Sequence, residues 1–521
     1  MIGKRPARPV SRWPANAGWG WPALWTLLTI VYVALLAGGA PDDMYITYRY
    51  AWNLSHGEGF VFNPGERVFG DTEPALGLLL AGLHVVTRIP IHVLGTALFG
   101  LSLLALATLI WREARSHGLR LEAALGGTLV VTSSALWVSQ GSAAATVLAL
   151  LAGAALWGER RPALAGLLAG AAVWCRPDAV LGVCAVGLLL WAGRRRFPLR
   201  WSVAAGAVIL LGVVTAWAWF GTPVPLTFEA KRLMDEAREL STAGPVGFWA
   251  RGSRVLADHW GPVWPLVAAL GIAGMWPLLR RGSRALRTVV LYGMAVAIAY
   301  PLLGVPFFSW YIVPTLVAAL YGLGGLLGAL GRAVSGRPSL RYRPFRRLAG
   351  MAAAGLSGAV LLASLSVGTV SLWRWPKFGG RYATYREAGL WIREHSSPEE
   401  RIAFGEIGNL AYWSQRPVDD MMGLVTPKAL PYVAVGDAIG AFRALRPDWW
   451  IRHDHGPQAR LHELPFFRRA YRLVARIEPP PDGAREVLVF RRRPGAPLPE
   501  PRPPVGPRQP KRPETLRPPP A

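Results

Sequence analysis

Charged residues are scarce for so basic a chain. Only 17% of the 521 residues are charged, although the formal net charge is +26. A soluble protein that binds nucleic acid would carry far more charge and less apolar mass. Lysine is scarce too, with 5 residues against 52 arginines, a skew that we give no mechanistic weight. The composition therefore excludes nucleic acid as a partner.

Cysteine is rarer still, and several familiar motifs are missing. The two cysteines, Cys175 and Cys184, lie in apolar stretches, and the chain has no CxxC pair. A disulfide framework is therefore excluded, and membrane-helix thiols are expected. The sequence also lacks a P-loop, a GxGxxG motif after a strand and a DxD motif.

Apolar and aromatic residues are abundant. Hydrophobic residues make up 52% of the chain, which contains 24 Trp and 17 Phe, so disorder is excluded as well. Runs long enough to cross a bilayer need roughly 20 apolar residues. The sequence predicts a polytopic α-helical membrane protein with about eleven transmembrane helices, at 19–39, 92–111, 122–139, 143–157, 162–175, 178–192, 201–220, 262–279, 286–305, 307–331 and 348–372.

Basic clusters between these runs predict the orientation. Four basic residues precede the first run, and the later clusters all fall on the same side when eleven crossings are assumed. Positive residues concentrate in cytoplasmic loops. We therefore expect a multi-pass protein of the cell membrane with a cytoplasmic N-terminus. The clusters are Lys4/Arg5/Arg8/Arg12, Arg112/Arg115/Arg120, Arg160/Arg161, Arg194–Arg196 with Arg200, Arg280/Arg281/Arg284/Arg287, and Arg332/Arg337/Arg341/Arg343/Arg346/Arg347.

The segments outside the runs predict three further regions. The apolar segment Pro74–Val86 would span only about 20 Å as a helix, so we interpret it as re-entrant or interfacial within a first external loop, 40–91. A second external loop, 221–261, has a charged helical centre. We assign 1–374 to the membrane domain.

The remaining chain predicts a small extracytoplasmic α/β domain over 375–493. A helix pattern at 385–395 is followed by strand patterns at 401–404, 448–452, 471–477 and 486–490. Residues 494–521 contain 12 prolines and no apolar periodicity, so a disordered tail is expected there. His453 and His455 flank Asp454, but no third metal ligand is apparent nearby.

The first external loop opens with two adjacent carboxylates, Asp42 and Asp43, after Pro41. Proline and acids suit the first turn of a helix, which is the simplest interpretation. The alternative is a general base, because a hydroxyl nucleophile must lose its proton as it attacks. Two neighbouring acids repel each other, which raises the pKa of one toward neutrality.

An aromatic and cationic face follows on the same predicted helix. Tyr45, Tyr48, Arg49 and Trp52 recur at helical spacing. Anchoring at the membrane interface explains such aromatics. Contact with a sugar ring is the alternative.

The run DDMYITYRYAWNLSHGEGFVFNPGERV resembles the signature of bacterial membrane glycosyltransferases of the GT-C type, notably the terminal arabinofuranosyltransferases of the cell wall. Weaker similarities follow in the family's order, so some likeness extends over about residues 20–490. They lie at Arg176-Pro177-Asp178, at GTPVPLTFEAK (221–231), at Trp310-Tyr311 with Pro314, and at GNLAYWS (408–414) with RPVDD (416–420) and GLV (423–425).

This resemblance implies a reaction. Such enzymes transfer a sugar from a polyprenyl-phosphate donor to an acceptor hydroxyl on the outer face of the membrane, with an acid of the first external loop as base. In this sequence that role maps to Asp42, with Asp43 as its neighbour or substitute. The acceptor would be a glycan, lipid or protein of the cell envelope, and the domain at 375–493 would bind or position it.

Candidate ligand-binding residues follow from the expected topology. Arg49, Arg176 and Lys231 all fall on the external side and are the candidates for the donor phosphate, with interfacial snorkelling as the alternative. For the sugar or acceptor the candidates are the rings of Tyr45, Trp52, Trp310 and Tyr311 and the acids Asp71 and Glu73.

The sequence also departs from the family pattern. Phe69 replaces a usual acid, Asp71 and Glu73 are additional acids, and the stretch 141–145 lacks the acid that members often carry there. We therefore do not transfer arabinose as the donor sugar. A divalent metal ion stays open as a cofactor. The competing functions are a flippase for lipid-linked sugars and a catalytically inactive envelope scaffold. The spans carry few charges at mid-membrane depth, which favours chemistry at one face over transport.

Overall fold

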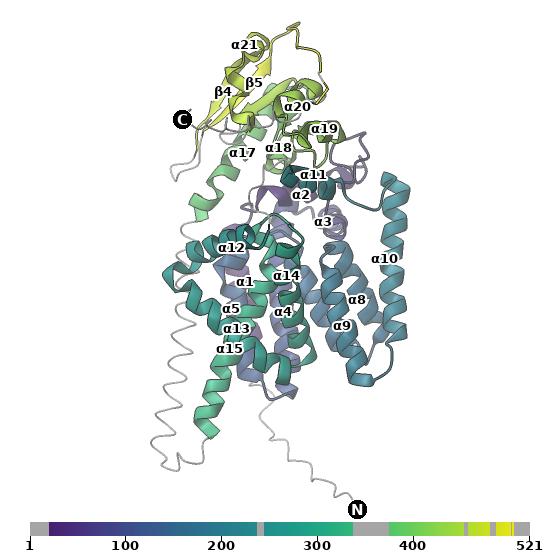
Figure 1. Cartoon of the computed structure of the whole chain (residues 1–521), viewed down its shortest axis with the longest axis vertical. Coiled ribbons are helices and arrows are strands. Elements are labelled where there is room, and N and C mark those ends of the chain that lie inside the picture. Colours follow the sequence, from purple (N-terminus) through teal and green to yellow (C-terminus); the bar gives the residue numbers. More distant parts are fainter. Residues whose placement is uncertain are drawn as a thin grey trace, which may run out of the picture.

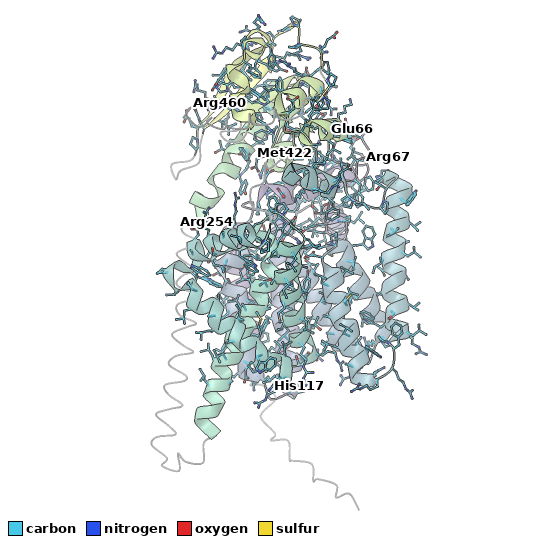
Figure 2. All side chains as sticks on the ribbon, in the orientation of Figure 1. Glu66, Arg67, His117, Arg254, Met422 and Arg460 are labelled. Atoms are coloured by element: carbon cyan, nitrogen blue, oxygen red, sulfur yellow. The ribbon has the colours of Figure 1, made fainter. Side chains whose placement is uncertain are left out.

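The structure, a computed structural model, describes residues 20–236, 244–336, 375–452, 457–479, 486–501 and 503–504. A bundle of apolar helices forms one end of the molecule, and a mixed α/β domain forms the other (Figure 1). His117 lies at the far end of the bundle, whereas Glu66 and Met422 lie where the bundle meets the α/β domain (Figure 2).

The bundle is built from the long apolar helices that the sequence predicts. α13 packs against α15, α15 against α5, and α10 against α8, with α10 at the outer edge in Figure 1. The helices are α1 (Gly20–Leu36), α4 (Ile91–Ser116), α5 (Arg120–Thr132), α6 (Ser134–Trp137), α7 (Ala144–Trp157), α8 (Pro162–Cys175), α9 (Ala179–Arg194), α10 (Leu199–Phe220), α13 (Trp264–Arg281), α14 (Arg284–Leu302) and α15 (Val313–Gly336).

Several of these helices have the length and apolar character of membrane spans. Within the described residues, five apolar stretches are long enough to cross a bilayer, and five apolar helices are shorter. Ten of the eleven predicted spans overlap helices of the bundle, and the eleventh, 348–372, lies outside the described residues. The span at 122–139 is broken at Ser133 into α5 and α6. The chain is thus a multi-pass membrane protein, and its orientation stays a prediction.

Small residues allow close helix packing in the bundle. A Cβ atom added at Gly274 of α13 would lie 1.8 Å from the carbonyl oxygen of Gly322 on α15. Only a glycine permits this approach, which is typical of helices that associate in lipid.

Four more helices lie between the bundle and the α/β domain (Figure 1). They are α2 (Asp42–Ser55), α3 (Pro74–Thr87), α11 (Leu226–Glu236) and α12 (Gly244–Trp260). α2 begins directly after Pro41 with both carboxylates in its first turn, where they favour the positive end of the helix dipole. α3 has only 14 residues, in agreement with the short segment predicted at 74–86.

The α/β domain contains one five-stranded mixed sheet in the order β2-β1-β3-β5-β4. β1 runs parallel to both β2 and β3, and β5 runs antiparallel to β3 and β4. The strands are β1 (Ile402–Phe404), β2 (Val418–Asp420), β3 (Trp449–Arg452), β4 (Tyr471–Ile477) and β5 (Val487–Arg492). Four of them confirm the predicted strands, whereas β2 was missed because its VDD sequence is short and acidic.

Helices surround this sheet. The predicted helix at 385–395 is the second half of α17, which packs against α18. The helical elements of the domain are α17 (Trp375–His395), α18 (Ile407–Ser414), η4 (Pro427–Ala429), α19 (Leu430–Val433), α20 (Ala438–Leu445), η5 (Pro457–Glu463) and α21 (Pro465–Ala470). His453 and His455 lie outside the described residues.

The α/β domain shares a hydrophobic core with the membrane part. Ile46 and Tyr50 of α2 and Ala230 of α11 belong to the same buried cluster as Ile402 and Val418 of the sheet. A separate cluster on the other side of the sheet includes Trp450 and Phe467. The domain is therefore packed directly onto α2 and α11.

Candidate functional site

A polar pocket opens where the bundle, the first external loop and the α/β domain meet. It contains about 400 Å³ of empty space, including its open mouth. Asp43 and Thr47 of α2 line it, together with the loop 70–73, Thr227 and Lys231 of α11, Trp310 of η3 (Ser309–Tyr311) and Leu424 of the α/β domain. The pocket is therefore lined by five segments that lie far apart in the sequence.

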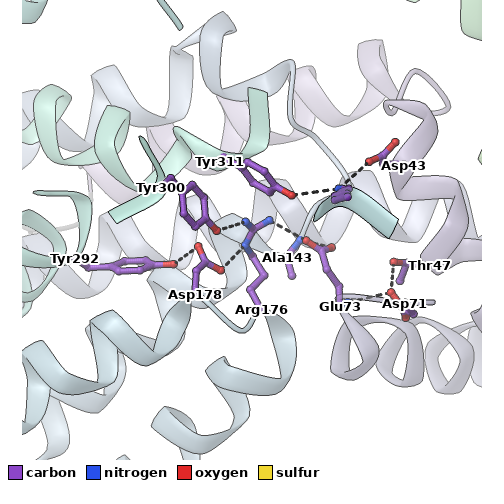
Figure 3. Close-up of polar contacts among 11 residues, drawn as sticks. Asp43, Thr47, Asp71, Glu73, Ala143, Arg176, Asp178, Tyr292, Tyr300 and Tyr311 are labelled. Carbon is purple, nitrogen blue, oxygen red and sulfur yellow. Dashed lines mark hydrogen bonds and ion pairs between the residues drawn. The ribbon is translucent and has the colours of Figure 1, made fainter. Parts of the chain in front are cut away.

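Asp43 and Lys231 face each other across this pocket. The Oδ2 atom of Asp43 lies 3.8 Å from Nζ of Lys231, and both side chains are partly exposed, at 29% and 14%. Lys231 also donates a hydrogen bond of 3.2 Å to the hydroxyl of Tyr311 (Figure 3) and lies over the ring of Phe308. Burial alone would lower the pKa of Lys231, but Tyr311 and Asp43 outweigh it and raise the pKa. The lysine is therefore a cation at neutral pH.

A second group of charged residues, around Arg176, lies next to the pair of Asp43 and Lys231. Arg176, in the turn between α8 and α9, donates hydrogen bonds to Glu73 at 3.1 Å and to Asp178 at 3.0 Å. Asp178 also accepts a hydrogen bond from Tyr292, and Arg176 lies within 3.5 Å of the Tyr300 hydroxyl (Figure 3). Arg176, Glu73 and Tyr292 are buried, the Asp178 side chain is only 5% exposed, and Tyr300 is partly buried. Two carboxylates therefore already compensate the charge of Arg176.

The loop 70–73 is fixed by its own acids. Asp71 accepts hydrogen bonds from the Thr47 hydroxyl and from the backbone N–H of Glu73 through Oδ1. Its Oδ2 atom has no hydrogen-bond partner among the described residues. Burial raises the pKa of Asp71 to about 6 and, despite the opposing charge of Arg176, that of Glu73 to about 7. Glu73 also accepts a hydrogen bond from the N–H of Ala143, at the start of α7.

Asp42 lies one residue before Asp43 but points away from the pocket. Its carboxylate accepts hydrogen bonds from the backbone N–H groups of Gly408 and Asn409, each at 2.8 Å, and from the Asn409 side chain at 3.2 Å. The side chain is buried, at 3% exposure. Burial, with repulsion from Glu406, raises the pKa of Asp42 to about 7. The carboxylate is enclosed by the first turn of α18.

The predicted aromatic and cationic face of α2 also points away from the pocket. Tyr45 is buried against Tyr412 and Trp413, and its hydroxyl donates to the carbonyl of Gly38. Arg49 is buried and donates to the Phe62 carbonyl and the Gln415 side chain. Trp52 stacks on His56, 4.0 Å between ring centres. The helical spacing correctly groups these residues, but their face packs mainly onto α18.

The pocket and its surroundings therefore bring together seven of the predicted residues, namely Asp43, Asp71, Glu73, Arg176, Lys231, Trp310 and Tyr311. Tyr45, Arg49, Trp52 and Asp42 lie outside it. Sequence reasoning missed Thr47, Asp178, Tyr292 and Tyr300. Asp178 could have been found, because it completes the Arg176-Pro177-Asp178 motif, whereas the tyrosines of α14 belong to no motif.

The acids of the pocket do not form a metal site. Among the described residues, no three His, Cys, Asp or Glu side chains are grouped so that they could hold an ion. Glu73 binds Arg176, Asp43 faces Lys231, and Asp71 accepts from Thr47 and the Glu73 amide. As arranged here, this donor set does not fit a divalent cation.

Comparison with known proteins identifies the fold. Residues 375–491 match a family described as a domain of unknown function (DUF8728). No curated protein matches the chain.

Three solved structures share the architecture at low identity. ArnT from Cupriavidus metallidurans bound to undecaprenyl phosphate is 13% identical, with a TM-score of 0.59 over 92% of this chain and 100% of that one. An oligosaccharyltransferase from Archaeoglobus fulgidus, tethered to an acceptor peptide, is also 13% identical, with a TM-score of 0.52 over 83% and 69%. The arabinofuranosyltransferase AftD from Mycobacteria is 15% identical, with a TM-score of 0.50 over 91% and 40%. The chain thus has the GT-C-like fold of membrane glycosyltransferases.

Proposed function

We propose that this protein transfers a sugar from a polyprenyl-phosphate donor to a hydroxyl of a cell-envelope acceptor, in the pocket between α2, α11 and η3. The observation that carries this proposal is the pairing of Asp43 with Lys231, 3.8 Å apart, in a pocket of a GT-C-like fold. The fold alone does not specify chemistry. An acid and a cation facing one small cavity are the two groups that this reaction needs.

Asp43 supplies the base. The acceptor oxygen forms a bond to the anomeric carbon while the bond from that carbon to the phosphate oxygen breaks. The proton of the acceptor hydroxyl passes to the Asp43 carboxylate, and the bonding electrons leave with the lipid phosphate. A single displacement of this kind inverts the anomeric configuration. A base positioned in this way contributes about 10²- to 10⁴-fold to the rate.

Lys231 supplies the cation for the departing phosphate. Tyr311 and Phe308 hold its ammonium group at the pocket wall, and its raised pKa keeps it charged. A fixed cation that meets charge developing in the transition state lowers the barrier. Arg176 does not line the pocket and acts on the phosphate site only indirectly. Its guanidinium lies 5.6 Å from the centre of the Tyr311 ring, and Glu73 and Asp178 hold it there.

Sugar and acceptor contacts are assigned to the remaining lining groups. Asp71 lines the pocket, so we assign its carboxylate to accept a hydrogen bond from a sugar hydroxyl. The ring of Trp310 lies at the pocket and stacks on Phe308, 4.9 Å between centres. Aromatic faces of this kind suit the apolar face of a sugar ring.

The test is transfer by the full chain in lipid vesicles. Purified protein is incubated with a panel of polyprenyl-phosphate sugars and an envelope extract, and product is followed by mass spectrometry. We compare Asp43→Asn and Lys231→Met with Glu229→Gln and Lys428→Met, which change exposed residues outside the pocket. Loss of transfer in the first pair alone supports the assignment. Transfer that persists in Asp43→Asn contradicts the base, and lipid translocation without transfer by the wild type favours the flippase.

A further inference from the structure

The α/β domain is attached to the membrane part through specific polar contacts as well as a shared core. The Asn63 side chain makes two reciprocal hydrogen bonds with the backbone of Val418, at 2.9 and 3.1 Å. Arg401 bridges Glu66 of the first external loop and Asp419 of β2, at 2.9 and 2.5 Å. These pairs fix one edge of the sheet against the first external loop.

The closest attachment is at Asp42. The carboxylate binds both N–H groups at the start of α18, and the two backbones touch at the same place. A Cβ atom added at Gly408 would lie 1.9 Å from the carbonyl oxygen of Asp42 and 3.1 Å from Cβ of Tyr45. A glycine is therefore required for α18 to dock against α2 in this position.

The docked domain also forms part of the pocket wall. Leu424 lines the pocket, and the Thr227 hydroxyl lies within 3.4 Å of the Leu424 carbonyl while it donates to Gly70 at 2.6 Å. A Cβ added at Gly70 would lie 2.5 Å from Val425. Asp420 holds this segment by accepting from the N–H groups of Met422 and Leu424. Movement of the domain would therefore move one wall of the pocket.

We infer that the α/β domain of 375–491 is a fixed wall of the transferase pocket, and that Asp42 is the positioning residue that docks it. Asp42 and Asp43 point to different sides of α2, so the two adjacent acids have separate tasks. Asp42 binds α18 and sets the register of α2 against the domain, and that register directs Asp43 toward Lys231. The docking is a property of the fold, whereas its catalytic consequence rests on the proposed transfer function.

Chemistry at Asp42 itself would require this contact to open. Both carboxylate oxygens already accept N–H groups, from Gly408 and Asn409, and the side chain is buried. A hydroxyl acceptor could reach the carboxylate only after α18 had left. The Asp43 side chain lines the pocket and is 29% exposed.

The experiment separates docking from chemistry in the full chain. We compare Asp42→Asn and Gly408→Ala with Asp43→Asn, and use Gly82→Ala as the control because a Cβ there meets nothing within 4 Å. Gly408→Ala keeps the Asp42 carboxylate but forces α18 away from α2. Hydrogen exchange of the α18 amides measures docking without any substrate. Transfer assays then give kcat, KM and their dependence on pH.

Asp42→Asn and Gly408→Ala are expected to behave alike. Exchange at 407–411 rises about tenfold or more, because the amides lose an acceptor or its alignment. KM rises and kcat/KM falls about tenfold to a hundredfold, since a shift of 1 Å at a reacting group has effects of that size. In both variants kcat still falls at low pH as it does in the wild type, which we call the acidic limb of the pH profile. Asp43→Asn keeps wild-type exchange and loses that limb together with most of kcat.

Two results would overturn the docking role. One is unchanged exchange in α18 after Asp42→Asn. The other is loss of kcat and of the acidic limb in Asp42→Asn while Gly408→Ala retains both, because Asp42 would then act chemically. If the wild type transfers no sugar, the proposed function fails, but the exchange data still decide whether Asp42 docks the domain.

Discussion

The two sides of helix α2 differ in what surrounds their charged groups. On one side, Asp43 is partly exposed and faces Lys231 in an open pocket. On the other, Asp42 and Arg49 are buried and bind groups of the α/β domain. Adjacent residues of the same type therefore acquire different environments because a helix turns by about 100° per residue. The position of the partner domain, rather than residue identity, determines which acid is accessible to a substrate.

The largest difference between the two sides should appear in the chemical step. Asp43→Asn removes the proton acceptor of the pocket, so kcat should fall about a hundredfold or more. Single-turnover transfer at saturating donor and acceptor measures this. Wild-type melting behaviour in the same sample would show that the fold is intact, and a kcat near that of wild type would remove Asp43 from the mechanism.

Lys231→Met should give the next largest loss. The variant keeps the length of the side chain but removes the cation that meets the leaving phosphate, so kcat/KM should fall about a hundredfold. Lys231→Arg keeps a charge and should retain more activity than Lys231→Met. Equal losses in the two variants would mean that the shape of the lysine matters and its charge does not.

Arg176→Ala should have the largest effect on stability. It leaves Glu73 and Asp178 buried without their shared cation, and breaking a buried pair in this way costs about 3–5 kcal/mol. Thermal unfolding in detergent measures the loss. Double variants that also carry Glu73→Gln or Asp178→Asn should recover part of it, whereas independent, additive losses would show that the three charges are not coupled.

The segment of the α/β domain that lines the pocket should respond to pH. Burial, with a contribution from the charge of Asp43, raises the pKa of Asp420 from 3.8 to about 7. The folded state thus binds this proton more tightly than the unfolded state, so its contribution favours folding most at low pH and is lost as pH rises from about 4 to about 7. Melting temperatures between pH 4.5 and 7.5 should fall less steeply in Asp420→Asn. An identical slope would contradict the raised pKa.

The smallest expected difference in kcat/KM is between variants of two tryptophans, one inside the pocket and one outside it. Trp310→Ala removes a ring of the pocket and should lower kcat/KM about tenfold, equivalent to a stacking contact of about 1.4 kcal/mol. Trp52→Ala changes a ring outside the pocket and should alter kcat/KM about twofold or less. The same assay measures both. A larger loss in Trp52→Ala would place the substrate on the opposite side of α2.

Much of the fold could be predicted from the sequence. Apolar runs locate the bundle helices because a membrane requires long apolar segments, and four of the five strands follow from alternating or apolar patterns. The strand Val418–Asp420 could not be found, since its acids are used for contacts with Arg401 and with backbone N–H groups. The number of crossings stays a prediction.

The site was only partly predictable. Short motifs locate Asp43, Lys231 and Arg176, but no sequence pattern reports that residues 408 and 409 enclose Asp42, 366 and 367 positions away. Nor does spacing along α2 say which face meets the pocket, because both faces carry acids and aromatics. Tyr292 and Tyr300 join the site through the packing of α14 against α15, α7 and α9.

The most direct test of the separate roles of Asp42 and Asp43 is the ratio of their kcat values. It is measured for Asp42→Asn and Asp43→Asn at saturating donor and acceptor. If Asp42 docks the domain and Asp43 is the base, Asp42→Asn retains kcat within about tenfold of the wild type, whereas kcat of Asp43→Asn falls about a hundredfold or more. The opposite ranking, with Asp43→Asn active and Asp42→Asn inactive, would contradict it and return the base to Asp42.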